Sequence, residues 1–198
     1  MGNLGSVRRA VIKIGGQPII IEHPEELKNA DRVILPGVGS FAEGMRNLSA
    51  GGWVQELHEY KERGRPMLGI CLGMQLLAGF GHEGGGCTGL SLIEGEVKKI
   101  NPTNLGIRVP HCGWNNIKIH GKSEELLCNI PSETDFYFSH SYAFFTQKDD
   151  NVLATVDYGG EINAIISEGS VFGTQFHPEK SSKLGLRLLQ NFLEIKSC

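Results

Sequence analysis

Hydrophobic positions in the first half of the chain alternate between two patterns, helical spacing and short continuous apolar runs. Apolar residues three and four positions apart share one face of a helix, and four stretches with this spacing cover residues 4–14, 40–50, 53–63 and 72–80. Short apolar runs are typical of strands buried on both faces, and three of them cover residues 18–21, 32–35 and 67–70. The alternation predicts helices packed on a parallel sheet.

The second half of the chain has a different pattern of apolar and turn-forming residues. Short β-rich segments separated by turn residues cover residues 96–100, 115–119, 136–139, 152–156, 162–167 and 171–174. A final helix with an apolar stripe is predicted over residues 182–195. We therefore expect an α/β fold: a three-layer, open, mostly parallel sheet with helices on both faces and antiparallel additions, forming one domain over residues 1–198.

Composition narrows the possible partners. The chain has 198 residues, 40% of them hydrophobic and 21% charged, and its formal net charge of −3 comes without a polybasic run. This argues against nucleic-acid binding and against binding to anionic membranes. No apolar stretch approaches the roughly 20 residues that span a bilayer, and the N-terminus has no signal-peptide core.

Cysteine usage points to a reducing compartment. The five cysteines are an odd number, widely scattered in a chain that is not small, so we expect no disulfide framework and a cytoplasmic protein. No Cys-x-x-Cys or His-Glu-x-x-His motif is present, and no metal site is predicted.

The most specific chemical signal is Gly69-Ile70-Cys71-Leu72-Gly73, where an apolar run ends and a helical pattern begins. This is the layout of a nucleophile elbow, a sharp strand-to-helix turn that exposes one side chain above a parallel sheet. Free N–H groups at the start of a helix favour a thiolate there. A cysteine in an apolar strand is alternatively a small core residue, but its bracketing glycines favour Cys71 as a nucleophile.

Far downstream, Gln175-Phe176-His177-Pro178-Glu179 supplies an imidazole and a carboxylate two positions apart. Proline keeps the preceding residue extended, so the side chains of His177 and Glu179 are expected to point to a similar side. Glu179 would orient the ring, and His177 would deprotonate Cys71 and later protonate the leaving amine. Without the elbow cysteine, a core histidine beside a surface glutamate would be the simpler interpretation.

An acyl-transfer site also needs donors for the tetrahedral oxyanion. We expect one from the N–H of Leu72 and a second from the loop that contains Gly37, Val38 and Gly39, although an ordinary strand-to-helix turn is also possible there. Gln75 follows Cys71 by one helical turn and either contacts substrate or caps a buried group.

These residues resemble a known family, the triad-type (class I) glutamine amidotransferases. The narrower resemblance is to the glutaminase subunits of imidazole glycerol phosphate synthase. The resemblance runs from residue 1 to about residue 195, and the segments that carry it are Pro36–Gly39, Gly69–Gln75, Val109–Asn115, Tyr137–Tyr142 and Gln175–Ser181.

The resemblance implies a complete activity. Cys71 would attack the side-chain amide of L-glutamine, glutamate would leave after thioester hydrolysis, and no cofactor would be needed. Ammonia would pass to a cyclase subunit, bound as a heterodimer, that forms imidazole glycerol phosphate in histidine biosynthesis. By the same resemblance, Gln75 would bind glutamine, residues 36–39 would complete the oxyanion hole, and Trp114, Tyr137 and Lys180 would face the cyclase.

The sequence departs from the family pattern in two places. Members usually have a short apolar strand before the Met-Gly-Asn-Leu that stands here at residues 1–4, so a missing first strand is expected to leave unpaired backbone near residues 18–21 and 32–35. Gly5 stands where histidine-pathway members commonly carry arginine, which keeps a second partner open, a bacterial surface-sugar amidotransferase.

Two further hypotheses keep the fold but change the role. The chain would be a cysteine hydrolase of peptides or esters, although no sequence feature supplies a peptide groove, or a non-catalytic interaction module, which only the absent strand favours.

Overall fold

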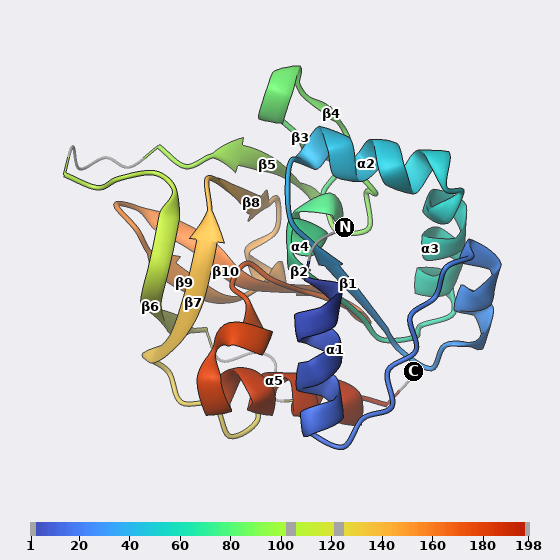
Figure 1. Cartoon of the computed structure of the whole chain (residues 1–198). Coiled ribbons are helices and arrows are strands. Elements are labelled where there is room, and N and C mark those ends of the chain that lie inside the picture. Colours follow the sequence, from blue (N-terminus) through green and yellow to red (C-terminus); the bar gives the residue numbers. More distant parts are fainter. Residues whose placement is uncertain (1–2, 102–105, 121–124, 197–198) are drawn as a thin grey trace.

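Helices surround a curled mixed sheet in the computed structural model, which describes residues 3–101, 106–120 and 125–196 (Figure 1). The α-helices are α1 (Leu4–Lys13), α2 (Phe41–Ala50), α3 (Trp53–Glu62), α4 (Leu72–Leu76) and α5 (Ser182–Glu194). The strands are β1 (Val33–Gly37), β2 (Met67–Cys71), β3 (Phe80–Gly81), β4 (Cys87–Thr88), β5 (Gly95–Lys99), β6 (His111–Ile119), β7 (Thr134–His140), β8 (Tyr142–Thr146), β9 (Val152–Asp157), β10 (Glu161–Glu168) and β11 (Val171–Thr174). Short 3₁₀ turns cover Pro24–Asn29, Glu83–Gly85, Asp149–Asn151 and Pro178–Lys180.

The central sheet joins a parallel part to an antiparallel part. Within the described residues it has seven strands in the order β1-β2-β11-β10-β9-β6-β7. Strands β1, β2 and β11 run parallel, and each remaining neighbour pair is antiparallel. A smaller sheet, β4-β3-β5-β8, carries further antiparallel pairs. The predicted α/β class with antiparallel additions is confirmed.

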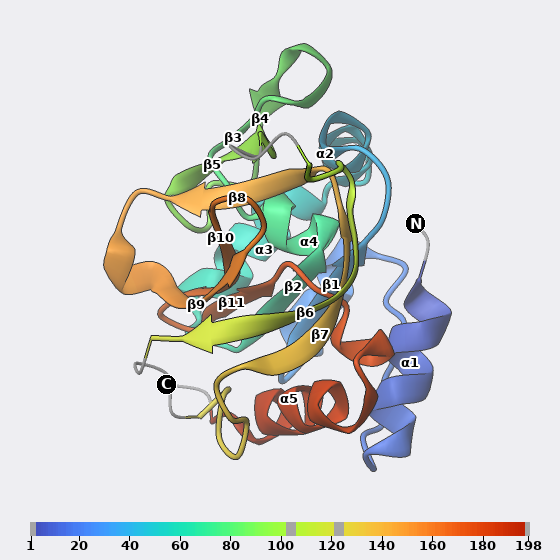
Figure 2. The ribbon, with the colours of Figure 1, turned by 90° about the vertical axis from the view of Figure 1, so that its left-hand side faces the viewer.

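Two apolar cores lie on opposite faces of β2, because successive strand residues point to opposite sides. Leu68 and Ile70 belong to the core beneath α1 and α5, whereas Met67 belongs to the core beneath α2, α3 and α4. Helices α1 and α5 lie side by side on their face of the sheet in both ribbon views (Figures 1 and 2). The predicted three-layer arrangement therefore follows from the alternation of buried side chains along β2.

Strand β7 shows how the antiparallel part is anchored. Thr134, Phe136, Phe138 and His140 are buried, whereas the residues between them are exposed or half-buried. This period of two is the pattern of a strand with one face on a core. It also directs a histidine into the interior at the end of the strand nearest the elbow.

The predicted strand over residues 18–21 is wrong. These residues adopt no regular secondary structure, and Ile19 and Ile20 are 87% and 48% exposed. Strand β1 lies at the edge of the seven-stranded sheet, so among the described strands none bonds its outer side. An isolated apolar run cannot satisfy its backbone groups as a strand without such a neighbour. Met1 and Gly2 of the Met-Gly-Asn-Leu segment lie outside the described residues.

Two smaller differences concern the segments that follow the elbow and strand β7. Helix α4 ends at Leu76 instead of continuing to residue 80, because the chain turns there to pair β3 with β4 and β5. Strand β8, which the sequence analysis did not predict, follows β7 after one residue and pairs with β5. Both differences arise from pairing with distant strands, which local spacing does not reveal.

The close approach of α4 to β1 predicts a large effect of one methyl group. A Cβ on Gly73 would lie 1.7 Å from the carbonyl oxygen of Leu35, so Gly73→Ala is expected to lower the free energy of unfolding by about 3 kcal/mol or more. Gly5→Ala is the matched control, because Gly5 is an exposed position of α1. Its added Cβ would meet only the end of the Arg9 side chain, at 3.4 Å. It should be neutral or stabilise by up to about 1 kcal/mol. Urea unfolding measures both, and equal values for the two variants would contradict this assignment.

Candidate active site

Cys71 occupies a strained turn between β2 and α4. Its backbone has φ 55° and ψ −110°, a conformation that non-glycine residues rarely adopt. A Cβ on Gly69 would lie 2.6 Å from the carbonyl oxygen of Gly73, so the two glycines permit the chain to reverse tightly around the cysteine. The turn therefore has the geometry that the elbow interpretation requires, and its sulfur lies at the carboxyl end of a parallel strand.

His177 and Glu179 form a buried ion pair. The His177 Nδ1 atom donates to Glu179 Oε1 over 2.9 Å, and the side chains are 3% and 0% exposed. Because Nδ1 is used in this way, Nε2 is the ring nitrogen left for the Cys71 thiol. The structure thus brings Cys71, His177 and Glu179 together from β2 and from the turn after β11.

The charges of these groups reinforce one another. Burial by itself would lower the pKa of His177, but hydrogen bonds to Cys71 and Glu179 and the charges of both raise it to about 9. Burial raises the pKa of Glu179, yet the hydrogen bond from His177 and its positive charge hold that pKa below its ordinary value. An imidazolium beside a carboxylate is the arrangement that stabilises a neighbouring thiolate.

The backbone around His177 is clamped to β7. The N–H of His177 donates to the carbonyl of Tyr137 over 2.9 Å, and the Ser181 hydroxyl donates to the carbonyl of His177 over 2.6 Å. The same hydroxyl accepts the N–H of Tyr137 over 3.0 Å. His177 is extended, as expected before Pro178, but residues 178–180 then form a 3₁₀ turn that brings Glu179 back to the ring.

Asn3 is a site residue that sequence reasoning missed. Its side-chain amide donates a short hydrogen bond to Glu179 Oε1, the oxygen that also accepts from His177. A hydrogen bond to an ionised carboxylate keeps it charged and fixes its rotamer. Only the resemblance of residues 1–4 to a family segment could have drawn attention to Asn3, because 176 positions separate the two partners.

Two glutamines lie beside the sulfur. Gln75 is 5% exposed, and its amide nitrogen donates to the carbonyl of Tyr142 over 2.7 Å and to Gln175 Oε1 over 3.1 Å. The amide nitrogen of Gln175 lies 4.0 Å from Cys71 Sγ. Gln75 therefore lies near Cys71, and Gln175, which the sequence analysis quoted only as part of a motif, connects the two side chains.

The expected oxyanion loop lies against the elbow. Gly37 is directly opposite Cys71 in the parallel register of β1 and β2, Val38 is 43% exposed, and Gly39 has φ +105°. Leu72 follows the sulfur as the first residue of α4. We propose Leu72, Gly37, Val38 and Gly39 as the source of the oxyanion donors, since this placement puts two backbone segments beside the nucleophile.

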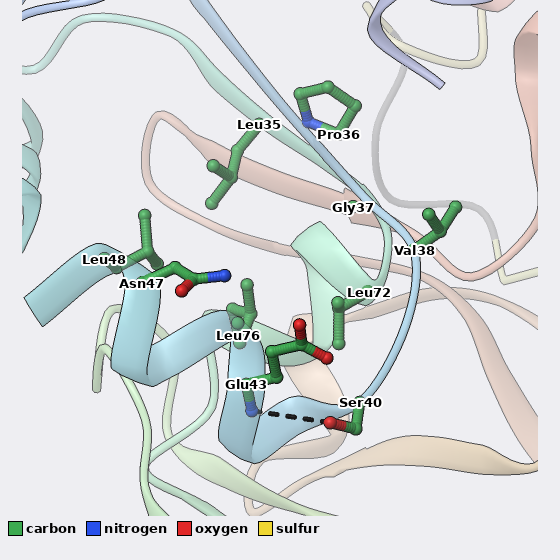
Figure 3. A pocket seen from close by; sticks show the side chains of 11 residues that line it. Leu35, Pro36, Gly37, Val38, Ser40, Glu43, Asn47, Leu48, Leu72 and Leu76 are labelled. Carbon is green, nitrogen blue, oxygen red and sulfur yellow. Dashed lines mark hydrogen bonds between the residues drawn. The ribbon is translucent and has the colours of Figure 1, made fainter. Parts of the chain in front are cut away.

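A cavity of about 210 Å³ lies between β1, α2 and α4, and Gly37, Val38 and Leu72 form part of its lining (Figure 3). Leu35, Leu72 and Leu76 form its apolar part, and Ser40, Glu43 and Asn47 its polar part. Cys71, His177 and Glu179 do not line it. We therefore do not assign the substrate of the triad to this cavity.

The three residues expected at a partner surface gather on one exposed patch. Trp114 is 53% exposed, and its ring meets that of Tyr137 edge-on at 6.0 Å between centroids. Lys180 Nζ lies 5.7 Å from the centre of the Tyr137 ring. Lys180 follows Glu179 directly, so this patch adjoins the back of the triad.

The described residues contain no group of three or more His, Cys, Asp or Glu side chains arranged to hold a metal ion. The cysteines in this part of the chain, Cys71, Cys87, Cys112 and Cys128, are free thiols. No helix in the described ranges has both the length and the apolar character needed to cross a membrane.

The electrostatics of the triad predict the titration of one ring. Since the pKa of His177 is raised to about 9, the ring should be protonated at pH 7.5 and lose its proton only as the pH rises toward 9. Glu179→Gln removes the charge but keeps the shape, so it should lower this pKa, whereas Glu25→Gln on an exposed turn should not. NMR titration of the ring carbons measures the pKa, and a wild-type midpoint near 6.5 would refute the assignment.

Comparison with known proteins identifies the family of this chain and covers almost its whole length. The family model described as glutamine amidotransferase class-I matches residues 2–195. Imidazole glycerol phosphate synthase subunit HisH from Moorella thermoacetica is 47% identical over 195 residues, which is 98% of this chain and 91% of that protein. HisH 1 from Campylobacter jejuni (strain 81-176) is 46% identical, over 98% of this chain and 96% of that protein.

Solved structures share the fold at lower identity. One titled as a glutamine amidotransferase superposes with a TM-score of 0.76 at 21% identity, covering 98% of this chain and 93% of the other. A glutamine amidotransferase from Thermotoga maritima superposes with a TM-score of 0.69 at 18% identity, covering 97% and 91%. These superpositions identify the fold, whereas the family model and the HisH sequences identify the family. The chain belongs to the class-I glutamine amidotransferase family and groups within it with the HisH proteins.

Proposed function

We propose that this protein is the glutaminase subunit of an imidazole glycerol phosphate synthase and that Cys71, His177 and Glu179 are its catalytic residues. The observation that carries the proposal is the buried His177 ring, held by Glu179 on one side and interacting with the elbow thiol of Cys71 on the other. The identity of about 46% to HisH subunits supports the reaction and the pathway.

The geometry suits two half-reactions. The Cys71 thiolate attacks the side-chain carbonyl carbon of L-glutamine, and the oxyanion that forms accepts from the proposed backbone donors. The C–N bond then breaks as His177 gives its proton to the departing ammonia. His177 next takes a proton from water, whose oxygen attacks the thioester, and glutamate leaves as the thiolate is restored. Gln75 is our proposed contact for the substrate glutamine, and no cofactor takes part.

Ammonia would pass to a cyclase subunit bound as a heterodimer. The patch of Trp114, Tyr137 and Lys180 is the proposed contact surface, because an exposed tryptophan packed beside a tyrosine and a cation is typical of interface anchors. The patch adjoins His177 through the Ser181 clamp to Tyr137. A partner seated there would therefore contact the segment that positions the catalytic base.

Residues 1–198 are proposed to form a single amidotransferase domain, which the family match over residues 2–195 supports. We propose a cytoplasmic location, in agreement with the four free thiols of the described residues and with the biosynthetic relatives.

The nucleophile assignment predicts the result of one substitution. Cys71→Ala should lower glutamate release by about three orders of magnitude or more, since removing a triad nucleophile abolishes the covalent path. The assay measures glutamate from L-glutamine, with and without the cyclase and its nucleotide ligand. The matched control is Cys128→Ala, because Cys128 is an exposed free thiol far from the elbow in sequence.

The same assay separates the alternatives. Stimulation of glutamate release by the cyclase supports the proposed partner. If the cyclase does not stimulate glutamate release but a surface-sugar amidotransferase does, the partner of the glutaminase is the surface-sugar amidotransferase. Turnover of small esters without a partner would indicate a cysteine hydrolase, and an inactive, folded wild-type chain would indicate an interaction module.

Asn3 is predicted to support the base indirectly. Asn3→Ala removes a donor to an ionised, buried carboxylate and should lower kcat about tenfold or more. Asn3→Asp should be worse, because it places two carboxylates in contact. Asn29→Ala, on the exposed end of a 3₁₀ turn, is the control and should leave kcat unchanged. Steady-state rates with the cyclase measure the series, and wild-type activity of Asn3→Asp would contradict it.

A further inference from the structure

A second pair of buried histidines lies outside the triad. His111 on β6 is directly opposite His140 on β7, and the residues are 2% and 6% exposed. His111 Nδ1 and His140 Nε2 are 3.0 Å apart. The mechanism above uses neither ring. Buried polar groups are normally hydrogen-bonded, so the partners of the two imidazoles indicate what they do.

The partners of these rings determine which nitrogen carries each proton. The carbonyl oxygen of Tyr142 can only accept, so His140 Nδ1, 2.9 Å away, is the donor. His140 Nε2 is then an acceptor, and His111 Nδ1 donates to it. His111 Nε2 is left to accept from the side-chain amide of Asn115 at 3.4 Å. The donors point in one direction along the whole row, from Asn115 toward Tyr142.

This row requires both rings to be neutral. A proton added to His140 Nε2 would set two N–H groups against each other across the 3.0 Å contact with His111 Nδ1. A proton added to His111 Nε2 would instead face the side-chain amide N–H of Asn115 at 3.4 Å. Burial lowers the pKa of His111 to about 3, with a further decrease from His140. Burial likewise lowers the pKa of His140 to about 4, although its hydrogen bond to the Tyr142 carbonyl opposes the shift. The hydrogen bonds and the electrostatics therefore agree on two neutral imidazoles.

The inner end of the row reaches the nucleophile. The carbonyl of Tyr142 accepts from His140 Nδ1 and, over 2.7 Å, from the amide nitrogen of Gln75. Gln75 also donates to Gln175, whose amide nitrogen is 4.0 Å from Cys71 Sγ. The same carbonyl thus receives a donor from the histidine pair and a donor from the proposed substrate contact.

The outer end of the row is the half-buried side chain of Asn115. Asn115 is half-buried, follows Trp114 on β6 and donates to the carbonyl of Asp157 over 3.1 Å. The His111 ring stacks between Tyr158 and Phe138, with centroid separations of 3.8 and 4.6 Å. These two contacts hold the imidazole plane in place while its nitrogens bond along the row.

We propose that His111 and His140 are positioning residues for glutamine, which hold the Tyr142 carbonyl, and through it Gln75, at the substrate site. This inference rests on the proposed glutaminase function. The histidines touch neither the thiol nor the substrate, and they act through the Tyr142 carbonyl. Since Gln75 is bonded directly to that carbonyl, loss of the row affects glutamine binding more than the chemical step.

Two substitutions separate positioning from packing. His111→Phe keeps a flat ring between Tyr158 and Phe138 but loses the donor to His140. His111→Asn loses the stacked ring but keeps an N–H near the position of Nδ1. His120→Phe is the control, because it removes an imidazole just beyond the other end of β6 whose contacts to Thr155, at 2.8 Å, and to Glu161, at 3.9 Å, lie outside this row.

The assay is glutamate release in the complex with the cyclase and its nucleotide ligand, with KM and kcat measured separately and thermal unfolding followed in parallel. For His111→Phe we expect the KM for glutamine to rise about tenfold and kcat to change less than threefold. For His111→Asn the KM should return most of the way to the wild-type value. The KM and kcat of His120→Phe should equal those of wild type. If His111→Phe does not fold, Asn115→Leu removes the outer donor from a half-buried position, and its KM should rise about threefold.

The outcomes are distinct. An unchanged KM in His111→Phe, or in Asn115→Leu where that variant replaces it, overturns the inference. A worse KM in His111→Asn than in His111→Phe also overturns it, because packing would then matter more than the donor. Absence of glutamate release from wild type and from His120→Phe would overturn the proposed function itself and the inference with it.

Discussion

The crowded backbone around Cys71 is the constraint on which the site depends. The carbonyl of Leu35 on β1 approaches Gly73 so closely that no side chain fits at residue 73. The carbonyl of Gly73 in turn leaves no room for a side chain at residue 69. The contact of Leu35 with Gly73 brings the start of α4 close to β1, directly after Cys71, whose φ is positive. It also sets the loop of Gly37, Val38 and Gly39 beside the nucleophile, since β1 pairs with β2 residue by residue up to Cys71. The strain at one residue is offset by the parallel pairing of β2 on both sides, with β1 and β11.

The protein has histidines in two opposite electrostatic settings, one in the turn after β11 and one on the neighbouring strands β6 and β7. His177 is buried beside a carboxylate and a thiol, and its pKa is raised to about 9. His111 and His140 are buried beside aromatic rings, a carbonyl and each other, and their pKa values are lowered. Burial opposes the charged form of all three, and the anionic neighbours of His177 reverse that effect only there. A protonated ring and a pair of neutral rings therefore lie close together, and the positive charge of His177 contributes to the low pKa of His140.

Strand β7 connects these two settings to the surface. Its inward residues end in His140, and the backbone of its Tyr137 is tied to His177 and Ser181. The Tyr137 ring meets Trp114 and Lys180 outside. One strand thus carries a residue of the exposed aromatic patch, a clamp for the backbone of His177 and one member of the neutral histidine pair. A partner that contacts the patch would bear on both inner networks through the same backbone.

The local sequence determined the elements whose signals are short-range: the helices, the strand into the elbow, the bracketing glycines, and the His-Pro-Glu turn that places Glu179 against His177. Even the period of two along β7 is visible in the order of its residues.

The tertiary structure decided what depends on distant neighbours. Residues 18–21 have a strand-like sequence but lack a described strand to pair with, and Ile19 and Ile20 lie exposed. Helix α4 ends early because the chain turns to form β3. Asn3, Gln175 and the pairing of His111 with His140 were equally hidden, since 176, 104 and 29 positions separate these residues from their partners and only the packing of the sheet and helices joins them. Local spacing encodes the conformation of a segment, whereas the partner of a buried polar group is chosen by the whole fold.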